Sequence, residues 1–200
     1  DGPPRERAKR FYLLGRAFQL LERGREAQRE YQRALEAYPH FPRVHCSLAT
    51  LAAGVRDLAE AAAQARRALA IDPEYAPAVF ALGQYAREAK DFPAALAYFD
   101  RVIHMESADD ALVRQSFLLK ADVRMAQARE TLTPQKRDAL VDEAVLYATQ
   151  AGRMDPKQAD AYIVKFFAQE VGQRVAESVE TLELALRTAE MSPEFRLQIL

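Results

Sequence analysis

The side chains in this sequence that are best suited to chemistry are one cysteine and three histidines. Cys46 directly follows His45, whereas His40 and His104 stand apart from that pair. A cysteine nucleophile needs a base that faces it across a cleft. Neighbouring residues of a helix instead point about 100° apart. We therefore expect no catalytic Cys-His pair at this position.

Motifs for phosphate, metal or acyl-transfer chemistry are also missing from the sequence. It contains no Gly-rich phosphate loop, no histidine pair at metal-ligand spacing and no Gly-x-Ser-x-Gly turn. The acidic pair Asp109-Asp110 suits the N-terminus of a helix, where carboxylates stabilise the helix dipole. The sequence therefore predicts a protein without enzymatic activity, metal or cofactor.

Composition narrows the classes of partner. The chain has 28 basic and 29 acidic residues and a formal net charge of -1, which argues against a nucleic-acid partner. Cys46 is the single cysteine, so no internal disulfide forms. No apolar run approaches the roughly 20 residues that span a bilayer. The chain begins at Asp1 rather than at a methionine, so we expect a processed form or a piece of a longer protein.

The elements that carry these residues are predicted by apolar spacing. Two segments, about 5–23 and 25–38, each show the three-and-four step of one helix face. Arg23-Gly24-Arg25 interrupts the pattern between them, as a polar turn containing glycine does. The sequence therefore predicts a pair of helices joined by a short turn at Gly24.

The pattern recurs along the chain at a constant interval. Ala27 and Ala34 return as Ala61 and Ala68, and Leu14-Gly15 returns as Leu48-Ala49 and again as Leu82-Gly83. Such a period, of about 34 residues, is typical of tetratricopeptide repeats. The chain resembles that family in its residues as well, through Phe11, Leu14, Gly15, Phe18, Ala27, Tyr31, Ala34 and Pro39.

The resemblance implies an all-α fold, an α-solenoid of stacked antiparallel helix pairs with the right-handed superhelix of that family. About five repeats are expected, with the fourth elongated. They cover about residues 8–41, 42–75, 76–109, 110–158 and 159–192. Residues 193–200 would begin a capping helix or a further repeat. Phe195, Leu197, Ile199 and Leu200 are too apolar for a free outer face, so we expect truncation there or cover by a neighbouring chain.

Small residues at fixed positions are expected to let neighbouring helices approach closely. Ala27 and Ala34 should lie at helix crossings, while Leu14 and Phe18 fill the volume beside Gly15. In the second repeat, Asp57 and Glu60 have the spacing of a capping box at the start of a helix.

The fourth repeat departs from the period. From Ser107 to Pro156 there are 49 residues, about 15 more than one repeat. We expect both of its helices to be about two turns longer, with Thr133-Pro134 starting the second. The tip from Glu130 to Lys136 should then protrude, either as a tolerated longer hairpin or as a partner contact or brace.

In arrays of this family the first helices of the repeats line a concave groove that holds a segment of a partner protein. The resemblance implies a groove that is basic, has two aromatic platforms and suits an acidic or C-terminal peptide. An equally simple interpretation is that its basic side chains are only solvated. The groove residues would be Lys9, Tyr12, Arg16, Gln19, Arg43, Ser47, Thr50, Phe80, Gln84 and Arg87.

The family resemblance also bears on two more specific interpretations. His45 stands where the family has an aromatic residue, so a packed or half-buried imidazole is expected.

The carboxylate clamp for chaperone tails, found in one subgroup of the family, needs lysines and asparagines. The matching positions here are Tyr12, Arg16, Ser47, Pro77 and Ala81, so this partner is disfavoured.

The leading functional hypothesis is a protein–protein interaction scaffold or adaptor. One alternative is a regulatory or substrate-presenting arm of a larger enzyme. Another is an assembly module that forms homo-oligomers through its last helix or its long fourth hairpin.

Overall fold

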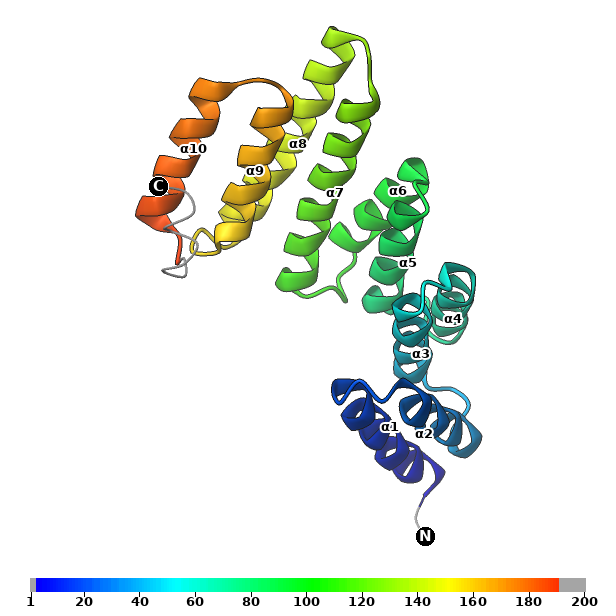
Figure 1. Ribbon diagram of the computed structural model, residues 1–200. Coiled ribbons are helices and arrows are strands. Elements are labelled where there is room, and N and C mark those ends of the chain that lie inside the picture. Colours follow the sequence, from blue (N-terminus) through cyan, green and yellow to red (C-terminus); the bar gives the residue numbers. More distant parts are fainter. Residues whose placement is uncertain (1–2, 191–200) are drawn as a thin grey trace. The chain divides into compact units, whose positions relative to one another are not determined.

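The computed structural model describes residues 3–190, which form ten α-helices joined by turns (Figure 1). The all-α prediction is therefore confirmed. The chain divides into two compact units, and the division falls within α6 (Phe92–Ile103). Unit 1 contains the described residues up to Ala94, together with Met105–Ser107. Unit 2 contains Ala95–His104 and the described residues from Ala108 onward.

Unit 1 is built from two complete helix hairpins and the first helix of a third. Its helices are α1 (Pro4–Leu20), α2 (Gly24–Ala37), α3 (Pro42–Gly54), α4 (Leu58–Ile71) and α5 (Ala76–Glu88). α1 packs against α2, and α3 against α4; α3 also contacts α1, α2 and α5. Consecutive hairpins are therefore stacked in chain order within this unit, as the repeat pattern predicts.

Unit 2 contains most of α6 and two further hairpins. Its other helices are α7 (Asp110–Glu130), α8 (Pro134–Met154), α9 (Ala159–Val171) and α10 (Val175–Thr188). α7 packs against α8, α8 against α9, and α9 against α10. Asp109 starts α7 by accepting a hydrogen bond of 2.8 Å from the Leu112 backbone N–H, which confirms the role expected of the acidic pair.

The recurring alanines are buried, as the sequence predicts. Ala27, Ala61 and Ala95 are each 0% exposed, and so are Ala34 and Ala68. Protein interiors are packed as densely as organic crystals, so we expect a larger side chain at these positions to strain the structure.

The surroundings of Gly15 differ in part from the expectation. The fully buried ring of Tyr31, rather than Leu14, covers this glycine, and Leu14 is 49% exposed. The equivalent Leu48 and Leu82 are buried. This position faces the preceding hairpin, and within the described residues no hairpin precedes α1.

The turns between the two helices of a hairpin do not use glycine as predicted. Gly24 opens α2, and the residue with left-handed backbone is Glu22, at φ 59°. Arg56, Lys90 and Gln173 hold the equivalent place, with φ of 62°, 60° and 58°. In each turn the backbone N–H of this residue donates to the carbonyl three residues earlier, and the N–H of the next residue donates to the carbonyl five residues earlier. In the first turn, Glu22 donates to Gln19 and Arg23 donates to Phe18. These are Schellman turns in which a residue other than glycine occupies the position that glycine favours.

Replacing such a residue with glycine should stabilise unit 1. Arg56→Gly is expected to raise the free energy of unfolding by about 0.5–1 kcal/mol, because glycine adopts positive φ without steric cost. Arg66→Gly, at an exposed position inside α4, should lower it by about 1 kcal/mol through lost helix propensity. Urea denaturation of both variants measures the difference, and two changes of the same sign would contradict this view of the turn.

The capping box predicted at α4 is present only in its first half. The Glu60 N–H donates to Asp57 Oδ1 at 3.0 Å, so Asp57 is the N-cap. The prediction of the reciprocal hydrogen bond, from the Asp57 N–H to the Glu60 carboxylate, is wrong. The Asp57 N–H donates to the Ala52 carbonyl at 3.0 Å, and the Glu60 carboxylate accepts from Gln64 Nε2 at 2.7 Å. The Schellman turn before α4 has already taken the N–H that a capping box would use.

The elongation of the fourth hairpin is confirmed. α7 and α8 have 21 residues each, compared with 13 and 14 in α3 and α4. Pro134 opens α8 as predicted, although the Thr133 side chain makes no cap hydrogen bond. Leu132 in the connection is 98% exposed. The predictions for Phe195, Leu197, Ile199 and Leu200 lie outside the described residues.

Candidate functional site

His45 and Cys46 do not form a reactive pair. His45 Nδ1 lies 2.8 Å from Gln64 Oε1, and Gln64 Nε2 donates to Glu60 Oε1 at 2.7 Å. Since the amide oxygen of Gln64 faces the imidazole, His45 Nδ1 carries the proton and donates it. The expected half-buried imidazole is therefore confirmed, and it is held by α4 rather than by Cys46. Burial raises the pKa of the Cys46 thiol to about 12, so the thiol is protonated at neutral pH.

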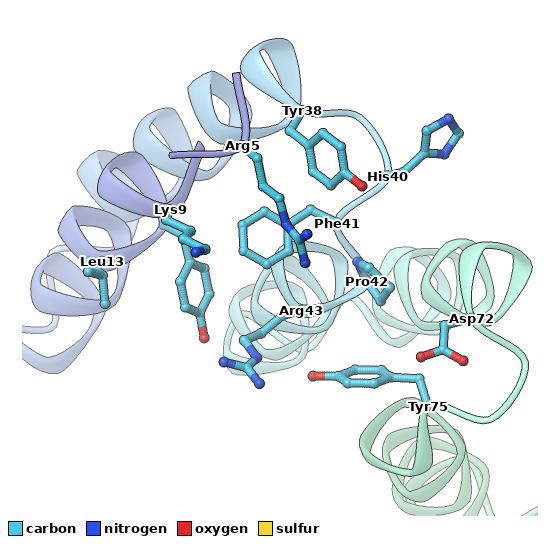
Figure 2. Close-up of a pocket in the computed structure, with 11 residues that line it drawn as sticks. Arg5, Lys9, Leu13, Tyr38, His40, Phe41, Pro42, Arg43, Asp72 and Tyr75 are labelled. Carbon is cyan, nitrogen blue, oxygen red and sulfur yellow. The ribbon is translucent and has the colours of Figure 1, made fainter. Parts of the chain in front are cut away.

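A pocket of about 450 Å³ opens in unit 1 where the N-terminal half of α1 meets two interhelix connections. Figure 2 shows its side chains, which come from α1, the α2–α3 connection, the start of α3 and the α4–α5 connection. We call this the basic-aromatic pocket. It is lined by Arg5, Lys9, Tyr12, Leu13, Tyr38, His40, Phe41, Pro42, Arg43, Asp72 and Tyr75.

Aromatic rings form one side of the basic-aromatic pocket. The Phe41 ring centroid lies 5.4 Å from that of Tyr12 and 6.3 Å from that of Tyr38. The Tyr38 ring in turn meets the imidazole of His40 edge-on at 6.5 Å. Tilted and edge-on arrangements of this kind are the favoured ones for aromatic pairs. The cluster therefore provides a fixed apolar surface beside the charged side chains.

Cations outnumber acids among the lining residues. Arg5, Lys9 and Arg43 are exposed, whereas Asp72 is the one lining carboxylate. Lys9 also pairs with Glu6 at 2.8 Å, but both side chains are more than half exposed, and such pairs contribute little. Figure 2 shows the Tyr75 hydroxyl pointing toward the Arg43 side chain. Burial raises the pKa of Tyr75, and the Arg43 guanidinium opposes that shift. The pocket can therefore attract an anionic group.

The ten predicted groove residues all lie in unit 1, and they differ in exposure. Lys9, Arg16, Arg43 and Thr50 are exposed, and Gln19, Gln84 and Arg87 are partly exposed. The remaining three are buried, namely Tyr12, Ser47 and Phe80. Three of the ten, Lys9, Tyr12 and Arg43, line the basic-aromatic pocket. The Tyr12 hydroxyl accepts a hydrogen bond of 3.2 Å from Arg16.

Sequence reasoning missed the part of this pocket that comes from the connections. Tyr38 and Asp72 are the C-cap residues of α2 and α4, and Phe41 and Tyr75 are the N-cap residues of α3 and α5. These positions do not belong to a helix face, so apolar spacing gives no signal for them. The two members of each pair lie one repeat apart, and that separation was the signal that could have identified them.

A second hollow, of about 490 Å³, lies at the opposite ends of the unit 1 hairpins. Leu48 and Leu51 of α3 and its C-cap residue Val55 line it, together with Asp57 and Glu60. Two of its three carboxylates already have structural roles, since Asp57 caps α4 and Glu60 accepts a hydrogen bond from a neighbouring glutamine, while Glu22 is the third. This hollow is therefore a weaker candidate for a site than the basic-aromatic pocket.

Unit 2 contains a buried lysine that the sequence did not single out. Lys120 in α7 is 5% exposed, donates a hydrogen bond to Asp100 and lies 4.0 Å from the centroid of the Tyr147 ring. A buried ammonium group needs such partners because leaving it without them costs several kcal/mol. The cluster links α6, α7 and α8 and serves their packing.

Metal ligation and membrane insertion find no support in the described part of the chain. Among residues 3–190, no group of three or more His, Cys, Asp or Glu side chains is arranged to hold a metal ion. No helix within the same range has the length and hydropathy of a membrane-spanning segment.

Comparison with solved structures identifies the fold. The chain is similar to the MamA protein, with 17% identity, a TM-score of 0.70 and coverage of 91% of both chains. It is similar to PilF of Pseudomonas aeruginosa, with 15% identity and a TM-score of 0.77, over 96% of this chain and 80% of the other. It is also similar to yeast Tom70, with 18% identity and a TM-score of 0.71, over 94% of this chain and 37% of the other.

Sequence comparison adds no further relative. The sequence matches no family model, and no curated protein matches it significantly. The 34-residue period, the buried alanines and these structural similarities agree with one another. The chain has the tetratricopeptide-repeat fold.

Proposed function

We propose that the protein is a non-enzymatic scaffold that binds an acidic segment of a partner protein in unit 1. The basic-aromatic pocket, extended along the predicted groove positions, is the binding surface. One observation carries the proposal: three cations and an ordered cluster of aromatic rings line the same hollow, with a single carboxylate among them.

The chemistry of the pocket favours a protein segment. Arginine pairs with carboxylates through two parallel hydrogen bonds, and rigid aromatic rings provide apolar contact at low entropic cost. A segment that carries acidic and apolar side chains uses both features at once. The formal charge of the whole chain is only -1, so the attraction comes from this local arrangement and not from net charge.

Charge reversal in the pocket tests the proposal. Peptides are selected from a displayed library of random linear sequences, and their affinities are measured by fluorescence anisotropy. Acidic sequences with an apolar residue should be enriched. Lys9→Glu combined with Arg43→Glu should weaken their binding by about tenfold, since two favourable contacts become repulsive. Added salt should weaken binding to the unchanged protein as well.

The matched control is Arg29→Glu combined with Arg66→Glu. These arginines are exposed on α2 and α4 and lie outside the pocket, so the change in net charge is the same. Binding should be nearly unchanged in this control. Enrichment of peptides without acidic residues, or equal weakening in both double variants, would contradict the proposed site.

A further inference from the structure

The basic-aromatic pocket consists of two successive copies of one arrangement. Three pairs of its lining residues are each separated by one repeat, and these pairs are Lys9 with Arg43, Tyr38 with Asp72, and Phe41 with Tyr75. Each copy has a cation on the first helix of a repeat, the C-cap residue of the second helix and the N-cap residue of the helix that follows. Stacked repeats therefore present the same kind of subsite twice.

The first subsite combines a cation with an apolar surface. It contains Lys9, Tyr38 and Phe41, and the neighbouring Tyr12 and Leu13 extend its apolar side. The two rings of Tyr38 and Phe41 meet at 6.3 Å. A carboxylate next to an aliphatic or aromatic side chain satisfies both parts of this subsite.

The second subsite has the same cation position but is more polar. It contains Arg43, Asp72 and Tyr75. Asp72 Oδ1 already accepts a hydrogen bond from the Glu74 N–H at 3.1 Å. The Arg43 guanidinium and the Tyr75 hydroxyl, which lie beside one another, remain as donors for an incoming carboxylate (Figure 2).

The series of cations ends after two copies. One repeat further along the sequence, the position of Lys9 and Arg43 is taken by Pro77, and the position of Tyr38 and Asp72 is taken by Glu106. A third acidic residue of the ligand would therefore find no cation at this position.

The spacing of the two cations determines the spacing of the acids. The helices that carry the two cations, α1 and α3, are in contact, and the axes of packed helices lie about 8–10 Å apart. A polyproline II segment rises about 3.1 Å per residue and returns to the same face every three residues, which gives about 9 Å. A β-strand instead places residues on the same face at intervals of two, which gives about 7 or 13 Å. Of these conformations, the polyproline II segment has the same-face spacing that falls within the range for packed helices.

We propose that the pocket recognises a segment in polyproline II conformation with two acidic residues three positions apart and an apolar residue beside the first. The inference rests on the proposed function, because it assumes that this pocket is the binding surface. The first acid pairs with Lys9 while its apolar neighbour contacts Phe41 and Tyr38. The second acid pairs with Arg43 beside Tyr75.

The experiment compares fluorescein-labelled synthetic peptides of identical composition. Each has two glutamates, one leucine beside the first glutamate, and serine and proline elsewhere. In these peptides the glutamates are adjacent, two apart, three apart or six apart, and a separate reference peptide of the same length has serine in place of the second glutamate. Anisotropy titrations with the intact 200-residue chain should show at least fivefold tighter binding for the spacing of three. Adding a third glutamate three positions beyond the second should not increase the affinity further.

Variants locate the effect within the pocket. Arg43→Gln should remove the advantage of the spacing of three, because the second acidic residue loses its partner. Lys9→Gln should weaken the binding of all the peptides. Circular dichroism melting checks that both variants remain folded, as expected for exposed side chains.

The outcomes separate the two proposals. If the acidic peptides bind equally at all spacings, or if the advantage persists in Arg43→Gln, the two-subsite inference is overturned while the proposed function stands. If none of the peptides binds, both are overturned.

Discussion

Ala68→Phe should lower the free energy of unfolding by about 2–3 kcal/mol, because the larger side chain has no room at a close helix crossing. Ala68 lies in α4 and is 0% exposed, and it occupies the position held by Ala34 one repeat earlier. Overpacking of a dense interior forces side chains out of their rotamers and moves the backbone. For a chain of this size, we expect the Tm to decrease by about 4–12 °C.

The matched control for this prediction is Ala70→Phe. Ala70 lies in the same helix, two residues away, and is exposed. The loss of helix propensity is the same in both variants, so the difference between them measures overpacking alone. Urea denaturation gives both free energies. Equal destabilisation of the two variants would show that Ala68 does not lie at a close crossing.

Gly15→Ala should also be strongly destabilising, although alanine is the better helix former. A Cβ atom at residue 15 would lie 2.5 Å from Cε1 of Tyr31. Tyr31 has little freedom to move, because its ring is fully buried and its hydroxyl donates to Gln19 Oε1 at 2.6 Å. Overpacking of about 1–3 kcal/mol therefore exceeds the gain in helix propensity of about 1 kcal/mol. The difference is a net loss of up to about 2 kcal/mol.

Gly54→Ala provides the opposite case. Its added Cβ would have no heavy atom within 4 Å, and no glycine among the described residues has positive φ. The same substitution should therefore be neutral or stabilising by up to about 1 kcal/mol at this position. A stabilising effect of Gly15→Ala, measured by the same urea denaturation, would show that the Tyr31 ring moves aside easily.

The helical part of the fold was predictable because its signals are local and repeated. Alanines that recur once per repeat identified the crossings, and Asp57 and Pro134 identified where helices begin. The turns were less predictable. Gly24 suggested the place of the turn, but it is the first residue of α2, and the hydrogen bonds of the Schellman turn place positive φ at Glu22 instead.

The candidate site was predictable only in part. Lys9 and Arg43 follow from the positions of the first helices in each repeat, and both line the pocket. Phe41 and Tyr75 lie in connections between hairpins, and the direction of a connection depends on how the hairpins pack. Helical periodicity contains no information about such residues, so their contribution to the pocket emerged only from the structure.

The sequence by itself determined the paired helices, their 34-residue period and the burial of the small residues between them, because these depend on contacts close along the chain. Only the tertiary structure decided which large side chains are covered. Leu14 and Leu48 occupy the same place in successive repeats, yet the first is exposed and the second buried. The physical reason is that burial is contributed by the neighbouring hairpin, and a residue's own helix does not reveal whether that neighbour is present.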